Sequence, residues 1–143
     1  MILETTHINR TDKQFIAELV DKPYSFFQKI KLKNVRSRWM LIEKVGPNLN
    51  SYFDPVSEAL RGRIERRPKG IVINISGHSK TYSWAIPYYQ LVIYKTDSIS
   101  IHAQGRFIQF GKNGSYKENK SFFKKLLDLK AQHSTGYYQF SGF

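Results

Sequence analysis

The hydrophobic residues near the start of the chain recur with the period of a helix. Four of them in TDKQFIAELVDK fall on one helical stripe: Phe15, Ile16, Leu19 and Val20. Thr11 and Gln14 have the spacing of a capping box, and Pro23 would stop the helix. The pattern predicts a short amphipathic helix that packs on a core.

The period changes to two in QKIKLKNVRSRWMLIEK, residues 28–44. The first half alternates lysine with apolar residues, as on the two faces of a strand: Lys29, Ile30, Lys31, Leu32 and Lys33. After Asn34, the segment RSRWMLIEK fits a strand, although Val35, Trp39 and Ile42 also have helical spacing. We interpret it as the second strand of a hairpin.

The next segment, DPVSEALRGR, carries the signals of a short helix. Asp54 is a suitable N-cap, Pro55 stands at the first helical position, and Gly62 is a stop signal. We therefore expect a short helix or helical turn here.

The chain from residue 69 onwards has the pattern of a sheet. Five short segments rich in β-branched and aromatic residues follow one another: GIVINIS, TYSWAIP, YYQLVIYK, SISIHA and RFIQF. The last three are separated by the turns Thr96-Asp97 and Gln104-Gly105. Parallel neighbours would need connections of about a dozen residues, so the pattern predicts an antiparallel meander.

The last segment, SYKENKSFFKKLLDLKAQ, combines a helix start with one broad apolar face. Ser115 and Glu118 have capping-box spacing. The apolar face consists of Phe122, Phe123, Leu126, Leu127 and Leu129, and the opposite face of Lys117, Lys120, Lys124 and Lys125. The predicted fold class is α+β: an antiparallel sheet or small barrel closed by this C-terminal amphipathic helix, with an extra N-terminal helix.

Composition adds a strong basic charge to this fold. The chain has 23 Lys+Arg against 11 Asp+Glu, a formal net charge of +12 that attracts polyanions. The main candidate group for binding an anion or a partner is Lys29, Lys31, Lys33, Arg36 and Arg38, and a second basic patch is Arg61, Arg63, Arg66 and Arg67. Lysines on one strand and arginines across a turn would converge on a phosphate group. The alternative is a solvated basic surface.

No pattern for catalysis or metal binding stands out. INISGHSKT has Gly77 and Lys80 after a strand, but a phosphate-binding loop needs a glycine directly before the lysine and a helix behind it. The histidines have no ligand-like spacing: His7, His78, His102 and His133. The absence of cysteine excludes disulfides and thiolate metal sites. We predict a non-enzymatic protein without metal or cofactor.

Several of these segments together resemble the pleckstrin-homology-like (PH-like) fold of bacterial proteins. They are KIKLKNVRSRWMLIEK, RPKGIVINI, IPYYQLVIYKTDSISIHAQGRFIQF and the helix that follows. In that family a lysine-bearing first strand precedes a basic turn, an Arg-aromatic pair and an apolar second strand; the matching residues here are Lys31, Lys33, Arg36, Arg38 and Trp39. Phe122 stands where eukaryotic members have a tryptophan. The resemblance implies a single domain with a helical extension (1–25), a PH-like core (26–132) and a tail (133–143).

We expect a basic binding module that engages a protein partner or an anionic surface through the first hairpin. The alternative is a nucleic-acid-binding protein whose aromatic residues stack on bases, namely Tyr82, Trp84, Tyr88, Tyr89 and Tyr94. The first residues, MILETTHINR, lack a signal-peptide pattern. No apolar run approaches the roughly 20 residues that span a bilayer. The expected location is the cytoplasm, with peripheral attachment to a membrane as one form of anionic-surface binding.

Overall fold

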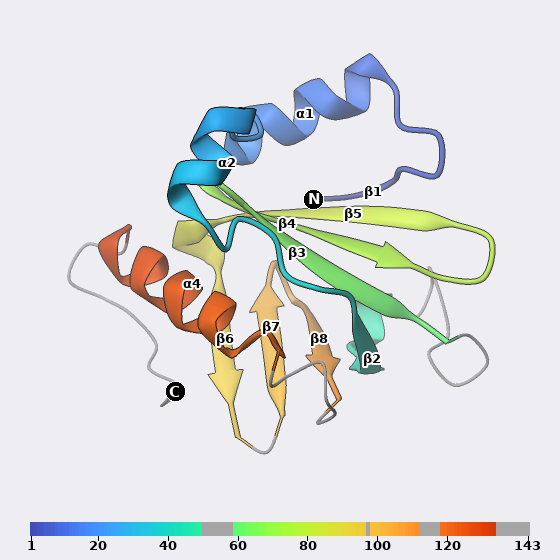
Figure 1. Ribbon diagram of the computed structural model, residues 1–143. Helices are drawn as coiled ribbons and strands as arrows, with labels where there is room; N and C mark the ends of the chain where they lie inside the picture. Colours follow the sequence, from blue (N-terminus) through green and yellow to red (C-terminus); the bar gives the residue numbers. More distant parts are fainter. Residues whose placement is uncertain (50–58, 97, 112–117, 134–143) are drawn as a thin grey trace.

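The described residues form an antiparallel sheet of eight strands, which is the framework of the fold (Figure 1). The computed structural model describes residues 1–49, 59–96, 98–111 and 118–133. The strands are β1 (Ile2–Glu4), β2 (Met40–Val45), β3 (Arg61–Arg67), β4 (Gly70–Ser76), β5 (Thr81–Pro87), β6 (Val92–Lys95), β7 (Ile99–Ala103) and β8 (Arg106–Phe110). The described helices are α1 (Arg10–Val20), α2 (Phe26–Leu32), α4 (Lys120–Gln132) and two short 3-10 helices, η1 (Pro47–Leu49) and η2 (Tyr88–Gln90). The α+β class and the antiparallel sheet are confirmed.

Strand β2 joins the two halves of the sheet, whose strand order is β1-β5-β4-β3-β2-β8-β7-β6. Met40 and Leu41 pair with β3. Ile42, Lys44 and Val45 pair with β8, and the register shifts between Ile42 and Lys44. An irregularity of this kind bends a strand. In Figure 1, β3, β4 and β5 run across the view while β6, β7 and β8 run down it, so the open sheet bends at β2.

The predicted meander is interrupted between TYSWAIP and YYQLVIYK. Strand β5 pairs with β4 and with β1, whereas β6 pairs with β7 in the other half of the sheet. The Gln104-Gly105 turn is confirmed: its two residues have φ values of 55° and 74°, the left-handed region that a two-residue hairpin turn requires. Asp97, in the other predicted turn, lies outside the described residues.

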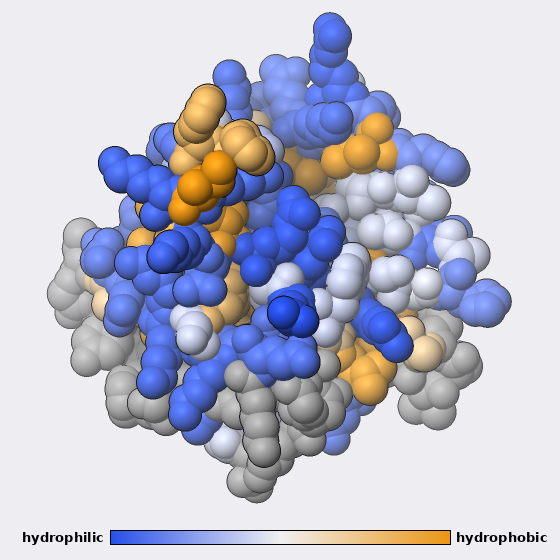
Figure 2. Space-filling model, in the orientation of Figure 1, coloured by the Kyte–Doolittle hydropathy of each residue, from blue (hydrophilic) through white to orange (hydrophobic). Residues whose placement is uncertain are grey.

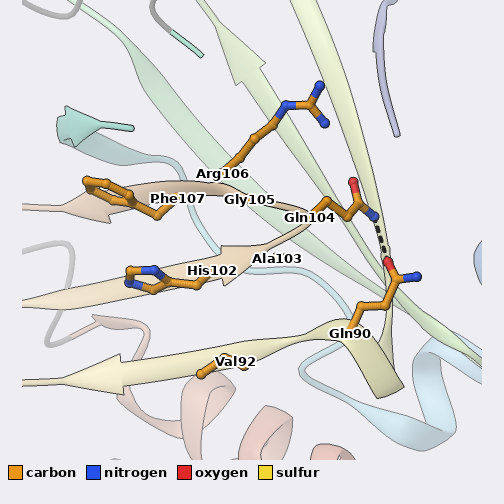
Figure 3. Close-up of a pocket in the computed structure, with 8 residues that line it drawn as sticks. All are labelled: Gln90, Val92, His102, Ala103, Gln104, Gly105, Arg106 and Phe107. Carbon is orange, nitrogen blue, oxygen red and sulfur yellow. Dashed lines mark hydrogen bonds between the residues drawn. The ribbon is translucent and has the colours of Figure 1, made fainter. Parts of the chain in front are cut away.

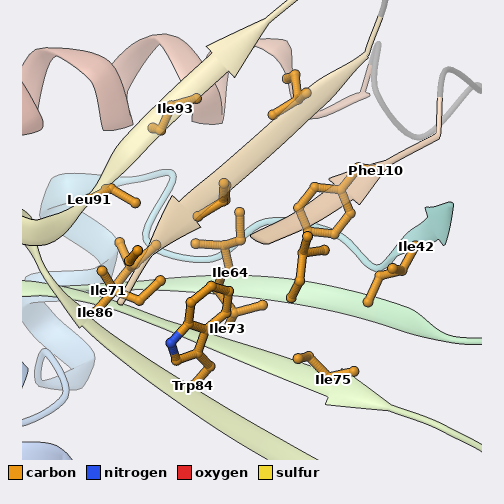
Figure 4. Close-up of a cluster of buried hydrophobic side chains, with 14 of the residues drawn as sticks. Ile42, Ile64, Ile71, Ile73, Ile75, Trp84, Ile86, Leu91, Ile93 and Phe110 are labelled. Atoms are coloured by element: carbon orange, nitrogen blue, oxygen red, sulfur yellow. The ribbon is translucent and has the colours of Figure 1, made fainter. Parts of the chain in front are cut away.

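The main core lies between the two halves of the sheet and α4 (Figure 4). Ile64, Ile73 and Trp84 are fully buried there, one from each of three neighbouring strands. Helix α4 contributes the buried Phe122, Phe123 and Leu126 and the partly buried Leu127 and Leu129, and it exposes Lys120, Lys124 and Lys125. The predicted faces of this helix are confirmed, whereas Ser115, Lys117 and the tail after His133 lie outside the described residues.

Helix α1 covers part of the other face of β4 and β5. A second core cluster forms there from Ile16, Val20, Val72 and Ala85. The helix is confirmed, but its N-cap is Asn9, whose side-chain oxygen accepts from the Asp12 N–H at 2.8 Å, and not Thr11. Phe15, which the sequence pattern placed on the buried stripe, is 49% exposed. The buried stripe of α1 is therefore narrower than predicted.

The predicted strand at residues 29–33 is wrong, because this segment is helical. Helix α2 begins with a complete capping box: the Ser25 hydroxyl accepts from the Gln28 N–H, and the Gln28 side chain accepts from the Ser25 N–H. It ends where Lys33 and Asn34 take φ values of 57° and 47°. The alternation over these five residues has the period of a strand, but so short a pattern is outweighed by the capping box at the start of the helix. The predicted hairpin is therefore absent, although RSRWMLIEK does contain a strand, β2, which pairs with β3 and β8.

The interpretation of Gly62 as a helix stop is also wrong. Arg61 and Gly62 begin strand β3, while residues 54–58 of the predicted helix lie outside the described residues. A Cβ atom at position 62 would lie 2.9 Å from the Phe110 ring. A small residue is therefore favoured here by the close approach of the buried Phe110 ring, not by a helix end.

We predict that Leu126→Ala lowers the free energy of unfolding by about 2–5 kcal/mol, because it removes a fully buried side chain between α4 and the sheet. Lys124→Ala, on the exposed face of the same helix, should change this free energy by less than about 0.5 kcal/mol. Urea denaturation followed by circular dichroism measures both values. A cost below about 0.5 kcal/mol for Leu126→Ala, with a larger cost for Lys124→Ala, would mean that the opposite face of α4 packs on the core.

Candidate binding surface

Helix α2 lies on the surface beside the sheet (Figure 1). None of its seven residues is buried, and three apolar side chains are largely exposed: Phe26 at 71%, Phe27 at 81% and Ile30 at 60%. Helices α1 and α4, in contrast, bury apolar side chains. Contiguous apolar side chains on a protein surface often mark a site of interaction, so α2 is the first candidate for a binding element.

The lysines of the first candidate group border this apolar side of α2. At about 100° per residue, the three apolar residues cover an arc of roughly 100°, with Lys31 beyond one border and Lys29 and Lys33 beyond the other. Figure 2 shows hydrophobic side chains gathered over α2 with hydrophilic ones around them. We call this set the α2 surface: Phe26, Phe27, Lys29, Ile30, Lys31 and Lys33.

Arg66 holds the C-terminal end of α2 against the sheet. Its side chain is 1% exposed, and its Nη1 donates to the carbonyl oxygens of Lys33 at 3.2 Å and Asn34 at 2.8 Å. Its backbone N–H donates to the Val35 carbonyl at 2.7 Å. A cation at this end of a helix meets carbonyl groups that the helix leaves without partners. Arg66, a candidate binding residue, therefore positions α2 and is not part of the accessible surface.

The structure brings Arg36 together with two arginines of the second patch. Arg36 Nη2 lies 3.9 Å and Arg67 Nε 3.5 Å from the same oxygen of Glu65, whose side chain is 8% exposed. The Arg63 guanidinium lies 4.6 Å from the centre of the Trp39 ring, in a cation–π contact. Burial lowers the pKa of the Arg67 guanidinium, and the adjacent Glu65 carboxylate partly offsets this. The one carboxylate leaves these three arginines with an excess of positive charge.

The remaining candidate arginines, Arg38 and Arg61, are exposed. The Arg38 backbone N–H donates to the Asn119 side chain at 2.8 Å, which ties the start of β2 to α4. Its guanidinium is 3.8 Å from Glu118, but both side chains are largely in solvent, so this pair contributes little stability. The accessible candidate cations near α2 and β2 are therefore Lys29, Lys31, Lys33, Arg36, Arg38 and Arg61.

An open hollow of about 380 Å³ lies at the β7–β8 hairpin (Figure 3). Its lining consists of Gln90, Val92, His102, Ala103, Gln104, Gly105, Arg106 and Phe107. The Gln104 amide donates to the Gln90 side-chain oxygen at 2.8 Å across one end. These side chains can exchange hydrogen bonds with a small polar molecule, but the described lining combines no nucleophile with a base.

His102 lies at this hollow within a small aromatic cluster. Its ring centre is 4.8 Å from that of Tyr94 and 5.1 Å from that of Phe107, and its Nε2 shares a hydrogen bond with the Ser100 hydroxyl at 3.0 Å. Burial lowers the pKa of the imidazole below its ordinary value of 6.5. The structure thus gives His102 one polar partner, Ser100, within a surrounding that is otherwise aromatic.

Comparisons with known proteins leave the function to be inferred from this geometry. No protein-family model, no curated protein and no solved structure matches the chain. Within the described ranges, no three His, Cys, Asp or Glu residues are grouped so that they could hold a metal ion. No helix described here is long and apolar enough to cross a membrane.

We predict that His102 makes the protein less stable in mild acid. Because its pKa is lowered in the folded state, the unfolded chain binds more protons just below pH 6.5, and stability falls as the pH drops through that range. His102→Gln should remove this part of the slope, whereas His78→Gln, in an exposed turn, should retain it. Unfolding free energies between pH 7.5 and about pH 5 measure the difference, and equal slopes in the two variants would contradict the prediction.

Proposed function

We propose that the protein is a non-enzymatic basic module that binds an anionic surface through α2 and the arginines that follow it. The observation that carries the proposal is the α2 surface, where cations border an exposed face that the described residues leave uncovered. The proposed contact residues are Lys29, Lys31, Lys33, Arg36 and Arg38. All five are accessible, although they lie on a helix and the segment after it.

We also propose that the fold is PH-like. Two features support this: the sheet bends at β2, and α4 packs its apolar face on the core between the two halves. In this proposal α2 lies in the chain between α1 and β2, where the resemblance implied a lysine-bearing first strand.

Electrostatic attraction is strong enough to give measurable binding. Each Lys or Arg near an anionic membrane contributes about 1 kcal/mol. Three lysines would therefore contribute about 3 kcal/mol, which is about a hundredfold in affinity. Salt screens such contacts over a distance of about 10 Å at 0.1 M ionic strength, so the binding should weaken as salt is added.

Nucleic acid has less support as the target. Three of the aromatic residues considered for base stacking are buried in the core: Tyr82, Trp84 and Tyr88. Tyr89 and Tyr94 are exposed at 73% and 43%, but they belong to η2 and β6 and not to α2. The buried aromatic residues cannot stack on bases. Of the five aromatic residues considered for a base-stacking surface, three are therefore excluded.

We predict that the triple substitution Lys29→Ala, Lys31→Ala and Lys33→Ala weakens binding to vesicles of phosphatidylserine and phosphatidylcholine by at least about tenfold. The matched control is Lys120→Ala, Lys124→Ala and Lys125→Ala, which removes the same charge from the exposed face of α4. This control should lose less than about threefold, because charge outside the contact acts only through screened, long-range attraction. Co-sedimentation at 0.1 M salt measures both variants.

Equal losses in the two triple variants would mean that net charge, and not the α2 surface, governs binding. A labelled single-stranded oligonucleotide tests the alternative in the same buffer by fluorescence anisotropy. Oligonucleotide binding without vesicle binding would overturn the proposal in favour of a nucleic-acid partner.

A further inference from the structure

We propose that α2 binds an anionic lipid bilayer by inserting Phe26, Phe27 and Ile30 into its interfacial layer, with the bordering lysines at the depth of the lipid phosphates. This inference rests on the proposed function and adds the identity of the surface. An anionic polymer or a free headgroup would satisfy the lysines alone. A bilayer satisfies the lysines and the three apolar side chains together.

The first support is the outward direction of the apolar side of α2. The three side chains are 60–81% exposed. The rings of Phe26 and Phe27 also contact each other edge to face, with centres 5.8 Å apart, so they form one continuous apolar patch. Burial of this patch in an interfacial layer would remove apolar surface from water.

The second support is the charge around the patch, which selects a bilayer over an apolar protein groove. The sequence has no Asp or Glu between Lys22 and Ile42. Lysine stems can lie along an apolar boundary while their ammonium groups reach the lipid phosphates. An apolar stripe with lysines on both borders is the pattern of helices that lie in the plane of a membrane interface.

The third support is the way in which the helix is attached. Arg66 holds the backbone carbonyls at the C-terminal end, so no side chain of α2 has to turn inward to keep the helix in place. Seven residues give a helix about 10 Å long, which is too short to cross a bilayer but sufficient to lie in its interface. The attachment therefore leaves the whole apolar side available to the membrane.

Depth-dependent fluorescence quenching tests the insertion directly. Phe27→Trp places an indole in the patch, and Tyr94→Trp places one at an exposed position on β6. Each variant is compared with the unsubstituted protein, which supplies the signal of Trp39 and Trp84. On vesicles of phosphatidylserine with acyl-chain-brominated phosphatidylcholine, the added fluorescence of Phe27→Trp should shift to shorter wavelength and be quenched. That of Tyr94→Trp should remain unchanged.

A variant that loses the apolar side chains but keeps the net charge separates insertion from electrostatic adsorption. Phe26→Ser, Phe27→Ser and Ile30→Ser together should weaken vesicle binding by roughly tenfold or more and leave binding to heparin, which has no acyl chains, unchanged. A control with three changes, Ile8→Ser, Phe15→Ser and Leu41→Ser, removes as many exposed apolar residues elsewhere and should bind vesicles like the unsubstituted protein. Circular dichroism and urea denaturation check that all variants fold.

The possible outcomes distinguish the two proposals. Vesicle binding that depends on the α2 lysines, but survives the serine substitutions and shows no quenching of Phe27→Trp, would overturn insertion and leave the proposed function standing. Absence of vesicle binding in the unsubstituted protein would overturn both proposals. In that case, capture of a protein that the serine variant fails to bind would assign the patch to a protein partner.

Discussion

The position of α2 depends on the buried guanidinium group of Arg66. This side chain is 1% exposed and donates to the carbonyl oxygens of Lys33 and Asn34. A buried charge is stable only when polar groups surround it, and the last carbonyls of a helix lack partners of their own. The Arg66 Nη1 group meets part of both requirements at the carbonyls that follow Leu32, although the Nε of Arg66 is buried without a hydrogen-bond partner among the described residues. Because α2 buries no side chain, this contact and the pairing of the following residues with β3 determine where the helix lies.

Helices α2 and α4 both contain lysines and two adjacent phenylalanines. The two helices differ in where these phenylalanines lie. In α4, Phe122 and Phe123 lie in the core, and the exposed lysines project from the opposite face into water. In α2, Phe26 and Phe27 face solvent, and the lysines border them. The same residue types therefore have different consequences. The exposed lysines of α4, namely Lys120, Lys124 and Lys125, interact with water, whereas those of α2 can act together with apolar side chains on one surface.

Most strands and the two longer helices could be predicted from the sequence, because buried runs such as GIVINIS and the apolar face of α4 each follow one period. Helix α2 could not be predicted from residues 29–33, since their alternation has the period of a strand; the signal for the helix is the Ser25–Gln28 capping box that precedes them. Strand β3, RGRIERR, carries charges at buried positions. Glu65 and Arg66 are stable there because they find partners distant in sequence. The basic candidates could therefore be named, but the buried Arg66 could not be separated from the accessible Lys31.

Hydrogen exchange of α2 tests whether the Arg66 guanidinium holds this helix in place. Arg66→Met keeps an apolar stem but removes the donors to the end of the helix, and Arg63→Met is a matched change on the same strand. The amides of residues 30–33, measured against those of β4 by NMR, should exchange roughly tenfold faster in Arg66→Met, since a donor to a carbonyl contributes about 1–3 kcal/mol. Arg63→Met should leave them unchanged. Equal exchange in both variants would mean that Arg66 does not hold α2, and extended-chain chemical shifts at residues 26–32 of the unsubstituted protein would mean that this helix does not form.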